Sequence, residues 1–237
     1  MVINTLKPKT TVIVPAKNEE RFIESCLKAL KNQTKPCEII VVDGHSTDRT
    51  RKIAEKYADR IVLDNRKGIA NARNIGARFA KRNIIAYCDA DAIPKKHWIE
   101  NIEKEIKGKI AVYGPIVPYD GGKKTKAALV FLNSLIQFLH TTRNPCFCAA
   151  NLAIRKSVLL KHKFNEKYSI LEDYELGSRL AKHGKITYSK KLAMPISSRR
   201  YEGRLLNTIF THYLRNAYRI KTGKNIDPGK YWSELRK

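Results

Sequence analysis

The alternation of short apolar segments with amphipathic ones over about the first 110 residues most constrains the fold of this chain. Periodicity predicts strands at 10–16, 37–44, 60–64, 83–91 and 109–118, with helices between them at 18–33, 46–59, 67–82 and 94–107. Strands and helices that alternate with loops of a few residues are typical of an open sheet covered by helices on both faces. The sequence therefore predicts an α/β fold with a mainly parallel sheet.

The alternation fades after Pro118, where a turn-rich stretch begins. The later patterns predict an apolar helix at 127–142, a strand and a helix within 145–162, a helix from near Leu171 to Gly184, and short extended pieces at 185–189 and 193–200. The end reads as a basic amphipathic helix at 204–224. A chain of 237 residues is long enough for one sizeable domain with a helical annex. We expect one domain over 1–200, with halves at about 1–118 and 119–200, and a helical extension over 201–237.

Three aspartates fall where predicted strands end. Asp43 closes the second apolar run, and Asp89 and Asp91 directly follow the apolar run at 84–88. In open α/β sheets, ligands bind beyond the carboxyl ends of the strands. Two neighbouring carboxylates repel each other unless a cation or hydrogen-bond donors neutralise them, and Mg²⁺ or Mn²⁺ prefers such hard oxygen ligands. Asp91 is therefore a candidate metal ligand, and a pair of solvated turn aspartates is the plainer alternative.

The formal net charge of +25 restricts the classes of partner. Such a surface favours polyanions such as nucleic acid, anionic lipid or phosphorylated small molecules, although a lysine-rich proteome from a hot environment would give the same excess. No apolar stretch reaches the ~18 residues that cross a bilayer. The first 20 residues lack the apolar region and cleavage site of a signal peptide. We therefore expect a cytoplasmic protein.

Four segments occur in a telling order and spacing: VIVPAKNEE, IIVVDGHSTDRT, GIANARNIGARFA and IIAYCDADAIP. Together they resemble glycosyltransferase family 2 over roughly residues 10–200. The resemblance implies a GT-A fold, which is Rossmann-like, and an enzyme that takes its sugar from a nucleoside-diphosphate sugar donor. It also implies a divalent metal, Mn²⁺ or Mg²⁺, and inversion of the anomeric centre. UDP is favoured over GDP as the nucleotide, although a carboxylate at Asp43 would accept an imide N–H from either base.

The resemblance also assigns roles to single positions. The residues that would line the nucleotide pocket after the first strand are Pro15, Ala16 and Glu19. Asp43 would bind the base, and the nucleotide and its phosphates would be approached by Gly68, Asn71 and Arg73. Asp89 would contact the ribose or the metal, and Asp91 would coordinate the metal. Local roles are the alternatives at nearby positions, with Asn18 and Asp48 as helix caps and Gly68 as a turn residue.

Two later clusters complete the expected site. In SILEDYELGSRL, Asp173 matches the family's catalytic base, with Glu172 as its neighbour. The acceptor hydroxyl must lose a proton as it attacks, and adjacent carboxylates raise one another's pKa toward a useful range. In ISSRRYEGRL, Arg199 and Arg200 would neutralise the leaving diphosphate. His212 is a further candidate metal ligand, with a helix-surface histidine as the alternative.

Two helices raise the question of a membrane surface. Residues 127–139 are apolar on most faces, and 204–220 mix apolar residues with arginines. Such segments suit the surface of an anionic membrane, which would make the protein peripheral on the inner face of the membrane. Packing of both helices on the sheet domain, or in a dimer interface, is the favoured alternative.

Two other functions remain open at this point. A sugar-phosphate nucleotidyltransferase would share the architecture, but VPAKNEE lacks the glycine-rich loop of those enzymes. A non-enzymatic basic nucleic-acid-binding protein would explain the charge, but no recognised nucleic-acid motif is present, so we expect no nucleic acid partner. The acceptor is open among a glycan, a lipid phosphate and a small molecule.

Overall fold

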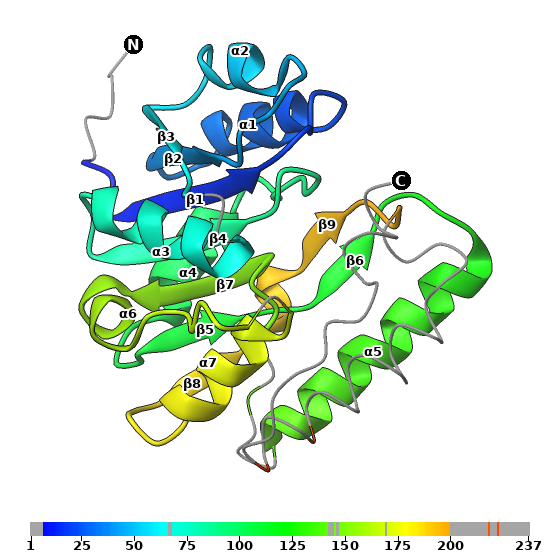
Figure 1. The fold of residues 1–237 in the computed structure, drawn as a ribbon. Helices are drawn as coiled ribbons and strands as arrows, with labels where there is room; N and C mark the ends of the chain where they lie inside the picture. The colour runs from blue at the N-terminus through cyan, green and yellow to red at the C-terminus, as the bar shows by residue number, and fades with distance from the viewer. Residues whose placement is uncertain are drawn as a thin grey trace.

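The computed structural model describes residues 7–65, 68–141, 145, 147–168, 170–199, 218 and 222. Within them a seven-stranded sheet has the order β3-β2-β1-β4-β7-β5-β8, and β6 pairs with β9 in a separate two-stranded sheet (Figure 1). The strands are β1 (Thr10–Ala16), β2 (Cys37–Asp43), β3 (Arg60–Leu63), β4 (Ile84–Cys88), β5 (Ala111–Tyr113), β6 (Ile116–Pro118), β7 (Asn151–Arg155), β8 (Ile186–Tyr188) and β9 (Met194–Ile196). The helices are α1 (Ile23–Lys31), α2 (Thr50–Ala54), α3 (Ile69–Phe79), α4 (Trp98–Glu105), α5 (Lys123–Thr141), α6 (Lys156–His162) and α7 (Glu172–Leu180), with a 3₁₀ turn at Lys190–Leu192.

The large sheet is mixed but mainly parallel, as the sequence predicts. Strands β3, β2, β1 and β4 run parallel, and so do β5 and β8. Only β7 is antiparallel, and it pairs with β4 on one side and with β5 on the other. The first and second halves of the chain therefore contribute neighbouring strands to one sheet.

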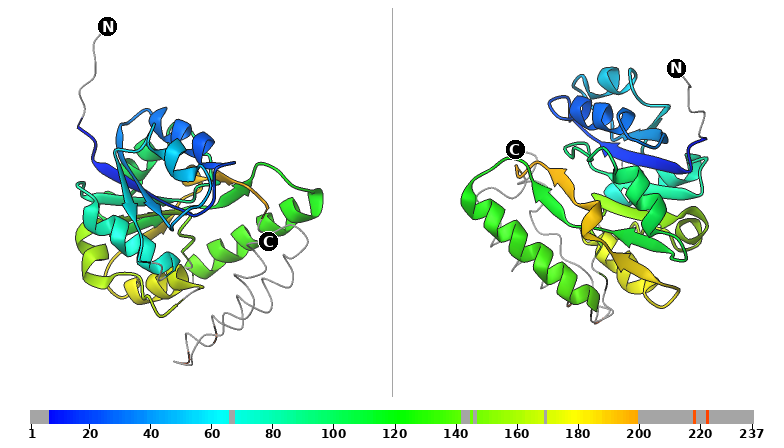
Figure 2. Two further views of the ribbon diagram at one scale, coloured as in Figure 1. Left: turned by 45° about the horizontal axis from the view of Figure 1, so that its top comes forward. Right: turned by 180° about the vertical axis from the view of Figure 1, so that it is seen from behind.

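Helices cover both faces of the sheet because successive residues of a strand point to opposite faces. In β1, Val12 and Val14 pack in one core with α1, α2 and α4, whereas Ile13 packs in the other with α3, α6 and α7. Figure 2 shows these layers from two further directions. Helix α3 lies unusually close to the sheet, since a Cβ on Gly76 would sit 2.6 Å from Ile13 Cγ2. A small residue at this position is thus a packing requirement.

The predicted fifth strand over 109–118 is wrong as a single element. The chain forms β5 in the large sheet and β6 in the small one, and Gly114 and Pro115 lie between them. Pro115 has no N–H to donate to a strand ladder. A Cβ on Gly114 would lie 2.7 Å from the Ser189 backbone oxygen, so the turn needs a glycine for space. This break carries the chain out of the large sheet toward β9.

Three predicted helix starts are also wrong. The helix expected from Pro94 begins at Trp98. Helix α1 begins at Ile23 rather than next to Asn18, whose positive φ of 56° places it in a turn. Helix α2 has only five residues and begins at Thr50, although the Asp48 carboxylate accepts a hydrogen bond from the Thr50 amide. In each case a tight turn occupies the residues that the pattern assigns to the first helical turns.

The predicted C-terminal extension lies outside the described residues, apart from Tyr218 and Thr222. Helix α5 is the long helix at the periphery in Figure 1, and Asn133 binds it to β6 by hydrogen bonds with the backbone N–H and C=O of Ile116. Within the described part of the chain, no helix combines the length and apolar character needed to span a bilayer.

Candidate active site

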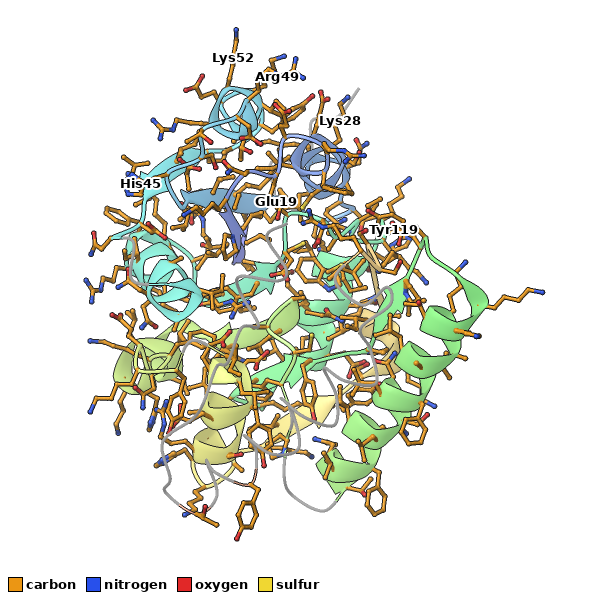
Figure 3. The ribbon with its side chains drawn as sticks, turned by 45° about the vertical axis from the view of Figure 1, so that its right-hand side comes forward. Glu19, Lys28, His45, Arg49, Lys52 and Tyr119 are labelled. Carbon is orange, nitrogen blue, oxygen red and sulfur yellow. The ribbon has the colours of Figure 1, made fainter. Side chains whose placement is uncertain are left out.

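The candidate site lies beyond the carboxyl ends of β1 and β4. Glu19, labelled in Figure 3, follows β1, and Asp89 and Asp91 follow β4. Parallel pairing of β1 with β4 brings these two strand ends to one edge of the sheet. The same edge is where ligands bind in open α/β sheets.

Arg199 joins two of the predicted donor-site residues. Its Nε donates to Asp91 Oδ2 at 2.9 Å, and its Nη2 donates to Glu19 Oε1 at 2.6 Å. The guanidinium carbon also lies 4.2 Å from the centroid of the Phe22 ring, which is a cation–π distance. Glu19, Asp91 and Arg199 are thus gathered in one cluster although 180 positions separate the first from the last.

The segment before Arg199 is held by the chain on both sides. The Ser197 amide donates to the Asp91 backbone oxygen at 3.0 Å. The Asp120 carboxylate accepts hydrogen bonds from the Ser197 hydroxyl at 2.8 Å and from the Ser198 amide at 2.5 Å. Both serines are buried. These bonds fix the backbone that presents Arg199 to the cluster, and sequence patterns gave no sign of the part that Asp120 takes.

Arg73 links a carboxylate that follows β4 with one at the start of α7. Its Nη2 lies 3.6 Å from Asp89 Oδ1, and its Nη1 donates to Glu172 Oε1. Its guanidinium carbon lies 5.6 Å from the centroid of the Phe164 ring. The side chain is only 6% exposed, so this pairing is a buried one. The resemblance implied an approach of Arg73 to the phosphates, but the structure shows it held between two carboxylates.

Asp173 and Glu172 occupy the first turn of α7. The Ala149 amide donates to Asp173 Oδ2 at 2.9 Å, and the Tyr174 amide donates to Oδ1 at 2.8 Å. Burial raises the pKa of both carboxyl groups, and the positive charge of Arg73 opposes that rise. A carboxylate with a raised pKa accepts a proton more readily near neutral pH.

Asn71 forms a hydrogen bond with Glu166, which lies outside the segment GIANARNIGARFA. Its Nδ2 donates to Glu166 Oε2 at 2.9 Å, and Asn74 Nδ2 donates to Glu166 Oε1 at 3.0 Å. The Asn71 Oδ1 is buried and has no hydrogen-bond partner among the described residues. Gly68, with φ of 92°, directly precedes α3 in a conformation that favours glycine. Glu166 has no local sequence signal that would reveal its contact with α3.

Asp43 lies at the end of β2 and is fully buried. Its Oδ2 accepts a hydrogen bond from Arg51 Nη2 at 2.9 Å, and its Oδ1 accepts one from the Ser46 amide at 3.2 Å. The neighbouring strand end carries Pro15 and Ala16, and the Ala16 oxygen accepts a hydrogen bond from the Gly44 amide at 2.8 Å. These contacts bring the predicted base-side residues to the same edge as Glu19.

Two predicted site residues, Arg200 and His212, lie outside the described residues.

Comparison with models of known protein families identifies the family of this chain. The model described as "Glycosyl transferase family 2" matches residues 11–162. The chain belongs to glycosyltransferase family 2. That membership confirms the family that the four N-terminal segments predict, and it gives the nucleotidyltransferase and non-enzymatic alternatives no support.

Among curated relatives, the glycosyltransferase AglE of Haloferax volcanii is 30% identical over 165 residues. The alignment covers 64% of this chain and 54% of AglE. The chain thus spans about half the length of this curated relative.

Solved structures of glycosyltransferases share the fold. TarS of Staphylococcus aureus superposes with a TM-score of 0.67 at 18% identity, covering 96% of this chain and 78% of that chain, and TarS has also been solved with UDP and with UDP-GlcNAc. The glucosyl-3-phosphoglycerate synthase of Mycobacterium tuberculosis, in complex with Mn²⁺, UDP and glucosyl-3-phosphoglycerate, has a TM-score of 0.63 at 19% identity, covering 93% and 81%. The fold is therefore GT-A.

The carboxylate oxygens of the candidate site fit a divalent ion only in part. Asp91 and Asp89 supply hard carboxylate oxygens, and the guanidinium on Asp91 shows that this buried carboxylate takes a cationic partner. In the described ranges, no group of three or more His, Cys, Asp or Glu side chains is placed to hold a metal ion. The residues present fit an ion whose other ligands come from a bound diphosphate.

Proposed function

We propose that this glycosyltransferase moves a sugar from a UDP-sugar to a hydroxyl acceptor, with inversion at the anomeric carbon and with Mn²⁺ or Mg²⁺. One observation carries the proposal: Arg73 contacts both Asp89, on the donor side, and Glu172, beside the candidate base. A donor held at Asp89 and an acceptor near Asp173 would then meet across one buried arginine. Direct displacement needs such a meeting of nucleophile and reacting carbon.

In this proposal Asp173 takes the proton of the acceptor hydroxyl as the oxygen attacks. The two backbone amides on its carboxylate hold it in one orientation. Glu172 is a positioning residue, because its carboxylate is tied to Arg73. On the donor side, Arg199 would turn from Glu19 and Asp91 to the diphosphate, joined by Arg200.

A metal held by Asp91 and Asp89 would act as a Lewis acid toward the leaving diphosphate. His212 is kept as a further candidate ligand. The Mn²⁺ and Mg²⁺ complexes of the mycobacterial synthase support metal use by this chain.

The nucleotide is proposed as UDP because the two related structures were solved with UDP or UDP-GlcNAc. The acceptor is proposed to be a hydroxyl of a glycan, a lipid phosphate or a small molecule. The name of the relative TarS contains poly(ribitol-phosphate), a phosphate-bearing polymer, which supports the inclusion of phosphate-bearing acceptors in this proposal.

We propose that the protein works in the cytoplasm, peripherally on the inner face of an anionic membrane. Helix α5 supports this location, because Val130, Phe131 and Phe138 lie on its outer side with exposed fractions of 62%, 65% and 62%. The helix contains three lysines near its start and no acidic residue. Exposed aromatic side chains beside lysines are typical of segments that lie on anionic lipid.

Calorimetric titration with UDP and GDP, each with and without Mn²⁺, tests the proposal. We expect UDP to bind at least tenfold more tightly with Mn²⁺ than without it, and GDP to bind more weakly than UDP. Tight binding of GDP would change the proposed nucleotide and leave the rest of the proposed reaction standing. If neither nucleotide binds in the presence of Mn²⁺, the donor site and the proposed reaction are wrong.

A further inference from the structure

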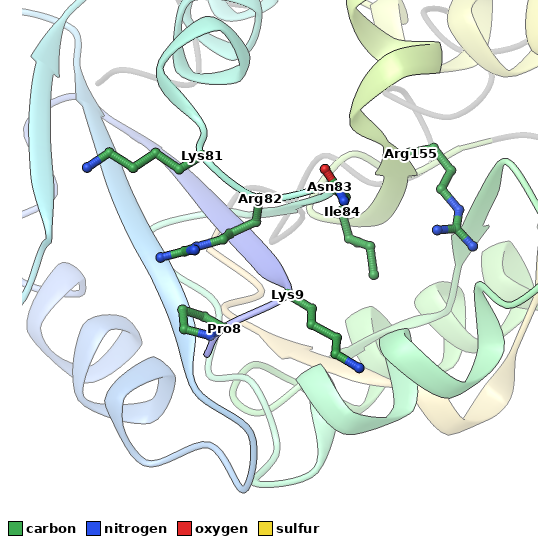
Figure 4. Close-up of a pocket in the computed structure, with 7 residues that line it drawn as sticks. All are labelled: Pro8, Lys9, Lys81, Arg82, Asn83, Ile84 and Arg155. Atoms are coloured by element: carbon green, nitrogen blue, oxygen red, sulfur yellow. The ribbon is translucent and has the colours of Figure 1, made fainter. Parts of the chain in front are cut away.

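A basic hollow lies at the other end of the sheet from the candidate active site. It has a volume of about 370 Å³, and four of its seven lining residues are cationic, namely Lys9, Lys81, Arg82 and Arg155 (Figure 4). None of the lining residues carries a carboxylate. A volume of this size falls in the range of roughly 300–1,000 Å³ found for small-molecule sites.

The sheet topology separates this hollow from the donor site. Lys9 directly precedes β1, whereas Glu19 follows the opposite end of that strand. Seven residues of strand at about 3.3 Å each put roughly 20 Å between the two ends. Arg155 reaches the same end because β7 is antiparallel, so that Arg155 pairs with Ile84, the first residue of β4. A ligand in the hollow would therefore leave the donor site open.

Arg155 is positioned in the hollow but not neutralised there. Arg155 is fixed by hydrogen bonds from its Nε to the Lys109 oxygen at 3.3 Å and from its Nη2 to the Ile106 oxygen at 3.1 Å. Both acceptors are neutral carbonyls. The Arg82 Nε is buried and has no hydrogen-bond partner among the described residues. A buried donor without a partner is costly, so a bound acceptor at this point would lower the free energy.

The Glu38 carboxylate lies next to the hollow but does not pair with these side chains. Glu38 accepts hydrogen bonds from the Thr11 hydroxyl at 2.5 Å and from the Lys81 backbone amide at 2.8 Å. Glu38 is buried, and its carboxylate is occupied by these two donors. Across the described ranges, none of the four cationic side chains forms an ion pair with a carboxylate. The hollow thus presents uncompensated positive charge around a small concave space.

We propose that this hollow binds a small ligand through a phosphate monoester group. A phosphate dianion offers acceptor oxygens to several guanidinium and ammonium donors at once, which matches the lining. The lining has no aromatic side chain for stacking a nucleobase, and its apolar part is limited to Pro8 and Ile84. The bound group is therefore a phosphate on a small polar body, whether a free metabolite or a phospholipid headgroup. This site is separate from the proposed transfer reaction and does not depend on it.

Titration with glycerol 3-phosphate, followed by calorimetry, tests the proposal in the full chain. The native protein is expected to bind saturably, and Lys9→Gln/Arg82→Gln to bind at least tenfold more weakly. The matched control is Lys28→Gln/Lys52→Gln, which removes the same charge from exposed positions on α1 and α2 and should bind within twofold of the native protein. Lys9→Glu, at an exposed position, gives a second variant in case Arg82→Gln disturbs folding.

Three outcomes would overturn the proposal: no saturable binding by the native protein, equal losses in the test and control variants, or preferential binding of an oligonucleotide that displaces glycerol 3-phosphate. Sedimentation with phosphatidic acid vesicles then separates the two sources of phosphate. Displacement of the protein from these vesicles by glycerol 3-phosphate, together with reduced sedimentation of Lys9→Glu, assigns a lipid headgroup. Binding of glycerol 3-phosphate without such displacement assigns a soluble metabolite.

Discussion

At the scale of single residues, two arginines organise the candidate site. Arg199 neutralises Glu19 and Asp91, and Arg73 neutralises Asp89 and Glu172. The sequence predicted all of these residues as members of the site from their motifs. It did not predict which carboxylate pairs with which arginine, because those partners are up to 180 positions apart and local spacing carries no information about them.

Asp91→Asn and Asp173→Asn should each reduce transfer by roughly 10²-fold or more, the scale of losing a metal ligand or a general base. Only Asp91→Asn should weaken Mn²⁺-dependent nucleotide binding, because Asp173 is proposed to act on the acceptor. Rates measured with a sugar donor, alongside calorimetric affinities, distinguish the two effects. Glu55→Gln, at an exposed carboxylate on α2's end, is the control. Equal transfer by Asp173→Asn and the native protein would exclude Asp173 as the base.

The pH dependence of transfer should reflect the buried carboxyl pair. Burial raises the pKa of Glu172 to about 7 and also raises the pKa of Asp173. Since Asp173 acts as a base in its ionised form, the rate should rise with pH through the raised pKa of Asp173 and level off above it. Arg73 lowers both pKa values, so Arg73→Gln should move the rising limb to higher pH and Arg73→Lys should move it less. A limb near pH 4, where ordinary carboxyls titrate, would contradict this reasoning.

At the scale of elements, hydrophobic periodicity predicted most strands and helices, and the errors lie where glycine and proline meet tertiary constraints. Gly114 and Pro115 split one apolar run into β5 and β6. The direction of β7 was equally invisible to periodicity, because an alternation of apolar residues is the same for parallel and antiparallel neighbours. The register that inserts β7 between β4 and β5 is set by long-range packing.

Gly76→Val should lower the free energy of unfolding by roughly 2 kcal/mol, within the range for overpacking a core. Its first added carbon would approach Ile13 Cγ2 to 2.6 Å and Val42 Cγ2 to 3.0 Å, forcing α3 away from the sheet. Gly122→Val is the matched control, because a Cβ there meets no atom within 4 Å. Urea denaturation of the two variants measures the difference. Equal midpoints would show that α3 has room to move.

At the scale of the whole molecule, the exposed outer side of α5 bears on where the enzyme works. This helix is anchored to β6, and β6 pairs with β9, which leads into the segment that presents Arg199. A surface bound by α5 would thus be held at a fixed position relative to the candidate site. Charge and apolar content predicted this helix from the sequence, but which of its sides is exposed required the fold.

Phe131→Ser/Phe138→Ser should weaken binding to anionic vesicles about tenfold or more, because burying each phenyl ring in lipid contributes roughly 1.5–3 kcal/mol at most. Co-sedimentation with phosphatidylglycerol vesicles provides the measurement. Leu63→Ser/Phe79→Ser removes two exposed apolar side chains from a different surface and should leave binding unchanged. Equal binding by both variants would exclude α5 as the contact, and a change in oligomeric state would assign it to a dimer interface.

The antiparallel strand β7 limits how enzymes of this architecture can be recombined. It comes from the second half of the sequence, yet it fills the gap between β4 and β5 of the first half. A fragment ending at Pro118 would leave those two strands without their shared neighbour. A chimera that joins two relatives at this boundary would therefore also exchange a central strand, and its success would depend on how well the foreign β7 fits its new neighbours.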